Sequence, residues 1–154
     1  MGDGAVFRSV DGMRLELKPR VVAQLRVHAQ VQPKTPESGG ILIGRRIAGS
    51  VDAVVDLATE PFPSDRRSRF RFTRLPTGHQ AVLDREWVSS TEVETYLGEW
   101  HTHASSDVSP STCDHRNWRR LQSRSGDSRL YFLIVGTETI GCWSDGVMWA
   151  LEGE

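Results

Sequence analysis

Residues 95–121 hold the pattern that most constrains how this chain of 154 residues can fold. The stretch T95-Y-L-G-E-W-H-T-H103 reads as a strand, and S109-P-S-T-C-D-H-R-N-W-R-R-L121 reads as a helix. Ser109 is suited to cap that helix, and Pro110 suits its first position. The short loop between the two elements predicts that the start of the helix lies against the end of the strand.

Two histidines end the predicted strand, and a carboxylate lies in the first turn of the predicted helix. His101 and His103 point to the same face, about 6–7 Å apart along the strand, because side chains alternate along a strand. Ser111 and Asp114 share a helical face because they are three residues apart. Two imidazoles and a carboxylate, with a fourth position open to water, are typical of catalytic zinc. A histidine pair alone is weak evidence, so a structural pair is the competing interpretation.

The rest of the chain mixes strands and helices without strict alternation, which favours an α+β (mixed α/β) fold. We predict one domain over residues 1–154. Val82 and Trp87 are expected to share one helical face, and His28 and His79 to be ordinary helix residues. The predicted strands are 13–19, 39–44, 51–59, 95–103 and 130–136, with hairpins over 39–59 and 140–151. The predicted helices are 19–32, 79–89 and 109–121. The first part of 61–72 is expected to be an exposed loop.

Composition narrows the classes of function. The formal net charge of -1 provides no general attraction to nucleic acid or acidic lipid. Two cysteines, Cys113 and Cys142, are too few for a disulfide framework and indicate a reducing compartment. No apolar run approaches the ~18 residues of a membrane span, and the N-terminus lacks the features of a signal peptide. We therefore expect a cytoplasmic protein that does not enter the membrane.

The histidines and the residues after them also match a known signature. H101-T-H103, seven further residues and S111-T-C-D114 resemble the H-x-H-x7-S-x-x-D pattern of the JAMM (JAB/MPN+) zinc metalloproteases. Upstream, E37-S-G-G-I-L-I-G resembles the glutamate and apolar strand of that family. The G98-E-W-H-T-H stretch and Trp118 are similar to a bacterial subgroup associated with ubiquitin-like conjugation and antiviral operons. The resemblance implies a single MPN/JAB-like domain in which helices flank a mixed sheet.

The resemblance also implies a role for each matching residue. His101, His103 and Asp114 would hold one Zn²⁺ ion per chain, which lowers the pKa of its water. Glu37 would be the general base, and Ser111 would donate a hydrogen bond to the oxyanion. The activity implied is that of a deubiquitinase-like isopeptidase, cleaving after the C-terminus of a ubiquitin-like protein. The chain departs from the family at Ala104, where proline is usual, and a looser loop is the expected consequence.

Other residues near the signature carry weaker predictions. Glu99 alternates with the histidines and is a candidate either to support the ligands or to act as a rival base; a purely structural role is the alternative. An arginine-rich stretch contains the candidates for a substrate-docking edge that would bind by strand addition, with a solvated loop as the alternative. These candidates are Arg69, Phe70, Arg71 and Phe72. Nucleic-acid binding is unlikely for this stretch, since few aromatic residues accompany the arginines.

Three alternative functions remain open at this stage. A sulfur-carrier-processing protease would use the same chemistry on another substrate. A non-catalytic scaffold of the same fold would bind a partner without cleaving it, and a DNA-associated module would use the arginines. The expected partners are a ubiquitin-like protein and its conjugates, with functional links to activating-like and conjugating-like enzymes.

Overall fold

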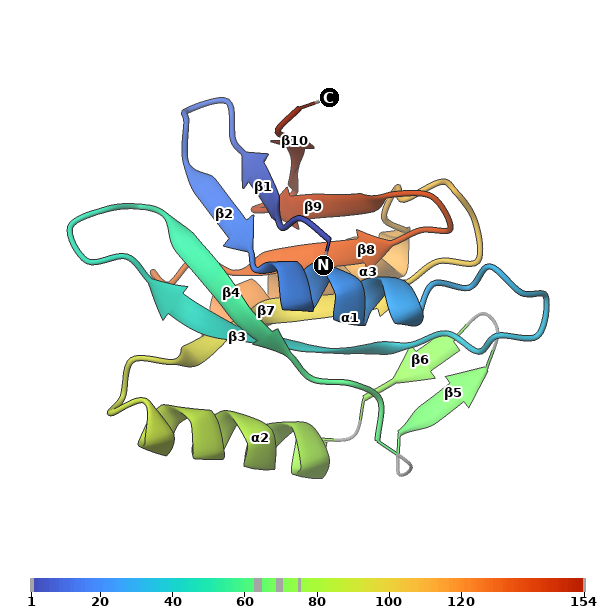
Figure 1. Cartoon of the computed structure of the whole chain (residues 1–154), viewed down its shortest axis with the longest axis horizontal. Helices are drawn as coiled ribbons and strands as arrows, with labels where there is room; N and C mark the ends of the chain where they lie inside the picture. The colour runs from blue at the N-terminus through green and yellow to red at the C-terminus, as the bar shows by residue number, and fades with distance from the viewer. Residues whose placement is uncertain (1, 63–64, 69–70, 75, 154) are drawn as a thin grey trace.

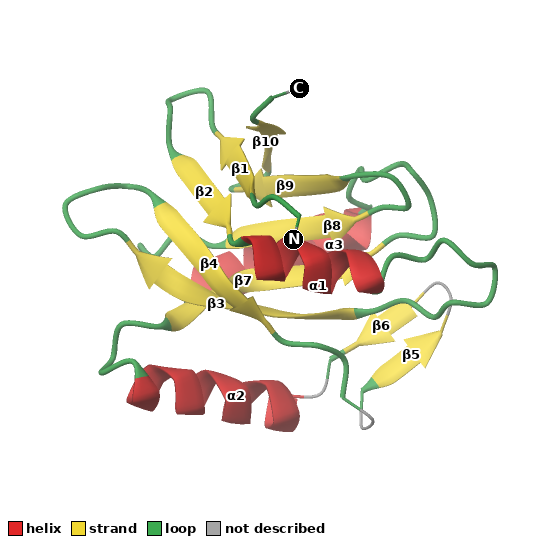
Figure 2. Ribbon diagram, in the orientation of Figure 1, coloured by secondary structure: helices red, strands yellow, loops and turns green. Residues whose placement is uncertain are grey.

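Ten strands and three helices make up the part of the chain described by the computed structural model, residues 2–62, 65–68, 71–74 and 76–153 (Figures 1 and 2). The strands are β1 Ala5–Arg8, β2 Arg14–Leu17, β3 Gly39–Arg46, β4 Ala53–Ala58, β5 Arg66–Ser68, β6 Arg71–Thr73, β7 Thr95–Thr102, β8 Tyr131–Val135, β9 Ile140–Ser144 and β10 Val147–Leu151. The helices are α1 Pro19–Val27, α2 Pro76–Ser89 and α3 Thr112–Arg124. None of these helices is long and apolar enough, over the described residues, to cross a membrane.

Eight strands close into a barrel in the order β1-β10-β9-β8-β7-β3-β4-β2. The β2–β4 and β7–β8 pairs are parallel, and the other neighbouring pairs are antiparallel. The mixed α/β class is therefore confirmed, while the closure of the sheet was not predicted. The hairpins predicted over 39–59 and 140–151 are present as β3–β4 and β9–β10.

Apolar side chains form two cores, one on each face of the sheet. Val21, Val22 and Leu25 of α1 pack into the larger core with residues of most strands. Trp118 of α3 packs into the second core, where its ring stacks on Phe132 with centroids 4.9 Å apart. The strand β8 lies between both cores and is buried on both faces, which explains its unbroken apolar sequence.

The strand β7 divides its side chains between the same two faces. Trp100 and Thr102 are buried, whereas Glu99 and His101 are partly exposed in the cavity beside α3. Since β7 and β8 are parallel, the chain crosses over between them through α3, and the end of β7 lies near the start of that helix. The topology thus brings the polar residues at the end of β7 and at the start of α3 to one place.

The start of α3 differs from the prediction. Ser109 does not cap the helix; Ser111 is the N-cap, and the helix begins at Thr112 rather than at Pro110. The Ser111 hydroxyl accepts from the Asp114 backbone N–H, and the Asp114 carboxylate accepts from the Ser111 backbone N–H. This reciprocal capping box satisfies two backbone donors, so it prevails over a single cap by Ser109.

The other two helices also differ from their predicted forms. α1 ends at Val27, five residues early, because the buried Gln30 bonds to Thr35 and Thr102 instead of continuing the helix. α2 begins at Pro76, and its Trp87 is 41% exposed, so the predicted shared face with Val82 is not a buried one.

His79 is wrongly predicted as an ordinary helix residue. Its ring is fully buried and contacts Asp65 (Nε2 to Oδ2, 2.7 Å) and Thr59 (Nδ1 to Oγ1, 2.6 Å). These contacts tie the start of α2 to the end of β4 and to the segment before β5. His28 ends α1 as its C-cap and lies 3.2 Å from Glu60.

The described residues in the first part of 61–72 form a loop as predicted, but they are not exposed, because Pro61 and Phe62 are partly buried and Asp65 is buried. Two short strands that were not predicted follow it. β5 and β6 pair with each other, and Ser68 of β5 accepts a hydrogen bond from the Glu37 backbone N–H. Pairing of the two short strands satisfies backbone groups that a loop would leave to water. Of the docking candidates, Arg69 and Phe70 lie outside the described residues.

Candidate metal centre and active site

His101, His103 and Asp114 meet where β7 ends and α3 begins. The His101 and His103 Nε2 atoms lie 3.2 Å apart. The Asp114 carboxylate reaches both rings, with Oδ1 3.4 Å from His101 Nε2 and Oδ2 3.5 Å from His103 Nε2. The structure therefore brings together three potential ligands from two elements, and all three side chains are partly buried.

The spacing of the ligand atoms is compatible with one bound metal ion. Nitrogen and oxygen ligands lie about 2.0–2.1 Å from zinc, so neighbouring ligand atoms in a tetrahedron are about 3.3 Å apart. The 3.2 Å between the two imidazole nitrogens is close to that value. The two carboxylate distances involve different oxygens of Asp114, and one ligand atom from each of the three residues lies within 4.8 Å of the other two.

His103 is held in the orientation that a metal ligand requires. Its Nδ1 lies 3.2 Å from the Asp107 carbonyl oxygen, which can only accept, so Nδ1 carries the proton and donates. Nε2 then presents its lone pair to the site. The loop after His103 is held as well, because the Thr137 backbone N–H donates to the Ser105 carbonyl (3.0 Å). This bond restrains the loop without the proline that Ala104 replaces.

The three side chains perturb one another's protonation. Burial alone would raise the pKa of Asp114, but hydrogen bonds from His101 and His103 outweigh it and hold the pKa far below its usual range. The hydrogen bond to Asp114 raises the pKa of His103, against the effect of burial. The carboxylate is thus ionised at any physiological pH, as a ligand must be.

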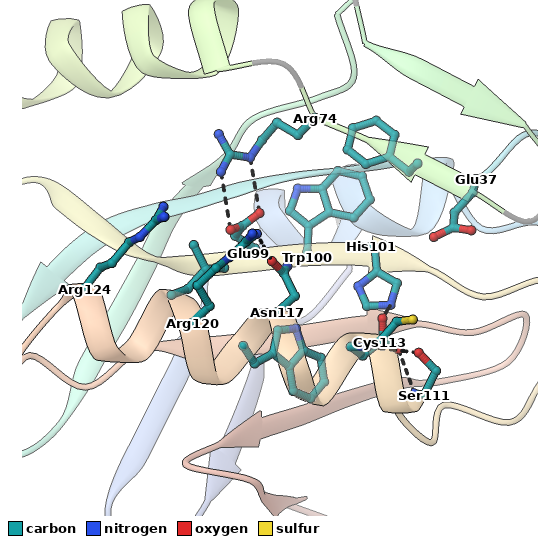
Figure 3. Close-up of a pocket in the computed structure, with 14 residues that line it drawn as sticks. Glu37, Arg74, Glu99, Trp100, His101, Ser111, Cys113, Asn117, Arg120 and Arg124 are labelled. Atoms are coloured by element: carbon teal, nitrogen blue, oxygen red, sulfur yellow. Dashed lines mark hydrogen bonds and ion pairs between the residues drawn. The ribbon is translucent and has the colours of Figure 1, made fainter.

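Glu37 lies in the loop before β3 and faces the same cavity. This cavity of about 800 Å³ is also lined by His101, Ser111 and Asp114, and Figure 3 shows the Glu37 carboxylate directed toward the histidine side. Burial raises the pKa of Glu37 to about 7, although the two histidines partly offset that effect. A carboxyl group that titrates near neutrality exchanges protons readily at physiological pH.

A buried polar network links the Glu37 loop to the histidine strand. Thr102, between the two histidines, points to the opposite face and is fully buried. Its hydroxyl accepts from the Ser38 backbone N–H (2.9 Å) and donates to Gln30 Oε1 (2.8 Å), while its backbone N–H donates to the Ser38 carbonyl. Sequence reasoning missed Thr102, Ser38 and Gln30; only the alternation along β7 hinted that Thr102 faces inward.

Glu99 shares a face with His101, but its carboxylate is engaged elsewhere. It accepts from the Arg74 guanidinium (3.2 and 3.4 Å) and from the Tyr96 hydroxyl (3.1 Å). Among the docking candidates, Phe72 lines the cavity and packs against Gly39, and the backbone of Arg71 lies in β6.

A barrel with a histidine pair at a strand end and a carboxylate on the next helix defines a JAB-type domain of the JAMM metalloprotease class. Residues 18–146 match the family described as prokaryotic homologs of the JAB domain, and the chain belongs to this family. The fold and family expected from the H-x-H signature are thereby confirmed, as is the assignment to the metalloproteases.

Named relatives and a solved structure agree with this placement. A Pseudomonas aeruginosa protein named CD-NTase/cGAS isopeptidase is 33% identical over 121 residues, 79% of this chain and 75% of the relative. A Vibrio cholerae protein of the same name is 36% identical over 131 residues, 85% and 81% of the two chains. A solution structure from Desulfitobacterium hafniense, 21% identical, shares the fold with a TM-score of 0.61 over 88% of each chain.

Proposed function

We propose that this protein is a zinc-dependent isopeptidase that hydrolyses the amide bond after the C-terminus of a ubiquitin-like protein. It would release that protein from conjugates or trim its precursor, within a bacterial antiviral system. The observation that carries the proposal is the convergence of His101, His103 and Asp114 at one place in the cavity that the partly buried Glu37 also lines. Because two relatives are named CD-NTase/cGAS isopeptidase, a CD-NTase is the proposed protein on one side of the cleaved bond.

Each polar residue of the cavity has a proposed part in the reaction. His101, His103 and Asp114 hold the ion, and bound zinc supplies Lewis acidity and a more acidic water. Glu37 takes the proton of the attacking water and delivers it to the leaving amine, acting as the general base and then as the general acid of the cavity. Ser111 donates its hydroxyl proton to the carbonyl oxygen as that oxygen gains charge, a contribution of about 3–4 kcal/mol.

Ser111 can serve as a donor while it caps α3. Its oxygen accepts from the Asp114 N–H in the capping box, and an accepting hydroxyl keeps its own proton for donation. The cap also fixes where the hydroxyl lies, so no reorganisation is needed during the reaction. The start of α3 therefore supplies one proposed ligand, Asp114, and one proposed donor.

The same proposal extends to the docking of the substrate and to the compartment in which the enzyme acts. The β5–β6 pair, with Arg71 and Phe72 in β6, is the proposed edge on which an extended substrate tail adds as a strand. Arg69 and Phe70 stay candidates for the same role from the sequence alone. We also propose that residues 1–154 act as one catalytic domain in the cytoplasm, alongside activating-like and conjugating-like enzymes. The exposed free thiol of Cys113 is compatible with a reducing compartment.

The test combines zinc content with cleavage of defined substrates. Purified protein is expected to hold about one zinc per chain by mass spectrometry and to cleave ubiquitin-like conjugates. His103→Ala should lose the zinc, and Glu37→Gln should keep it but lose cleavage. Glu138→Gln, an exposed carboxylate outside the cavity, is the matched control.

Two results would contradict the proposal. One is cleavage by Glu37→Gln at the wild-type rate; the other is protein that lacks zinc although no chelator was used. Parallel assays on sulfur-carrier fusions separate that related activity from isopeptide cleavage, since both use the same residues.

A further inference from the structure

The cavity continues past the proposed metal ligands along one side of α3. At that far end it is lined by Arg74, Glu99, Asn117, Arg120 and Arg124. Figure 3 shows Arg120 and Arg124 extending from α3 on the side where Arg74 and Glu99 lie. A smaller hollow of about 380 Å³ opens the other way, over the loop at 103–109. The longer branch has room for several residues of an extended chain.

The charges at this far end do not cancel. Glu99 is paired with Arg74 and also accepts from Tyr96, so its negative charge is already compensated. Arg120 donates to the Asn117 side-chain oxygen (2.6 Å), which is neutral. Neither Arg120 nor Arg124 forms an ion pair with a carboxylate among the residues that the structure describes. Two exposed positive charges therefore remain next to a neutral pair, along the cavity that all four side chains line.

We propose that this branch is a subsite for acidic side chains in the extended C-terminal tail of the protein whose carboxyl group forms the cleaved bond. The inference rests on the proposed function, because it assigns a substrate preference to the same site. Guanidinium groups pair with carboxylates in a bidentate geometry, so aspartate or glutamate is the chemistry that fits.

The helix sets the position of the acidic residues in the tail. α3 rises about 1.5 Å per residue, which places Arg120 about 9 Å and Arg124 about 15 Å beyond Asp114. An extended chain advances about 3.3 Å per residue. The arginines are therefore level with about the third to fifth residue before the cleaved bond.

Binding of product-like peptides tests the subsite without requiring catalysis. The probes are fluorescein-labelled eight-residue peptides with a free carboxyl terminus, differing only in having Glu, Gln or Lys at the third and fifth residues from that end. Fluorescence anisotropy on the full chain should show the Glu peptide binding at least tenfold more tightly than the Lys peptide. The preference should shrink as salt is added, because the arginines are exposed.

Variants of α3 make the test specific. Arg120→Glu with Arg124→Glu should reverse the order of the peptides, and Arg120→Gln with Arg124→Gln should abolish the preference. Arg116 is on the same helix but does not line the cavity, so Arg116→Glu should leave the preference for the Glu peptide unchanged. Circular dichroism confirms that each variant is folded.

Three results would overturn the subsite. They are equal binding of all peptides, an order that persists in the double glutamate variant, and tighter binding of a single-stranded DNA oligonucleotide that depends on the same arginines. If conjugates are cleaved with a kcat/KM that does not depend on the charge of the tail, the subsite is contradicted and the proposed function stands. If peptide binding depends on charge but no conjugate is cleaved, the subsite stands and the proposed function is contradicted.

Discussion

Ser111 combines a structural role with a proposed chemical one, and the two can be separated. Glycine is nearly as good an N-cap as serine, at a cost of a few tenths of a kcal/mol, but has no hydroxyl. Ser111→Gly should therefore change the free energy of unfolding little, while kcat falls about 10²–10³-fold. Urea denaturation and steady-state kinetics on a ubiquitin-like conjugate measure the two effects.

Ser111→Thr is the control, since threonine retains both the cap and the hydroxyl. Its kcat should stay close to that of the wild type. Wild-type kcat in Ser111→Gly would show that this hydroxyl does not act on the reacting carbonyl.

Thr102 is expected to position Glu37 without touching the substrate. Thr102→Val conserves shape but removes the hydroxyl that bonds to the Ser38 N–H and to Gln30 Oε1, a cost of about 1–3 kcal/mol for each buried hydrogen bond that is lost. The Glu37 loop should then shift, so that kcat falls while zinc stays bound. Kinetics, zinc analysis and a pH–rate profile measure this, and Thr102→Ser should restore the rate. Loss of zinc in Thr102→Val would instead show that the residue acts through the histidines.

At the level of elements, the close contact between β7 and β8 holds the histidines beside α3. Gly98 of β7 has φ +143°, and a Cβ there would lie 1.7 Å from the Tyr131 carbonyl oxygen of β8. Gly98→Ala should therefore disrupt the parallel pair and lower the free energy of unfolding by about 4 kcal/mol or more. Urea denaturation measures the loss.

Gly49→Ala is the matched control for that substitution. Gly49 also has a positive φ of +72°, but nothing lies within 4 Å of an added Cβ. Its cost should be limited to backbone strain, about 1–2 kcal/mol. Equal losses in the two variants would show that backbone strain, and not the contact with β8, dominates at Gly98.

For the whole molecule, pH should act in opposite directions on the metal-free and zinc-loaded forms. In the metal-free chain the pKa of His103 is raised above 6.5 by Asp114, so this pair stabilises the fold below pH 6.5 and loses its effect as pH rises through the raised value. The raised pKa values of Glu37 and Glu94, each about 7, act in the same direction between pH 4.5 and 7. The stability of the metal-free chain should thus fall from pH 5.5 to 8.

Zinc reverses this trend because it requires the neutral form of His103. Protons compete with the ion for His103, whose pKa is raised above 6.5. Zinc affinity should therefore decrease as the pH falls through that raised pKa. Zinc at about 1,000 times its Kd adds about 4 kcal/mol to the stability. Tm measured with and without zinc at pH 5.5 and 8 should show the larger gain at pH 8, and no gain for His103→Ala. An equal gain at both pH values would contradict the involvement of His103.

Local patterns within single elements were read correctly from the sequence. Alternation along 95–103 placed His101 on the face opposite Trp100, and the three-residue spacing of Ser111 and Asp114 placed the two side chains together at the start of α3. These predictions succeed because spacing inside a strand or helix determines which side chains share a face. The N-cap was missed, since Ser109 and Ser111 are equally good caps locally and only the reciprocal bonds with Asp114 distinguish them.

Contacts between distant segments were decided by the tertiary structure alone. The β1–β10 pairing of the closed barrel, the buried Gln30–Thr102–Ser38 network and the pairing of Glu99 with Arg74 join residues that are 25 to 144 positions apart. No local pattern specifies such partners, because they depend on which faces pack together when the two cores form. The sequence by itself determined the ligand types and the faces that carry them, whereas packing decided how those faces meet and which charges remain without partners.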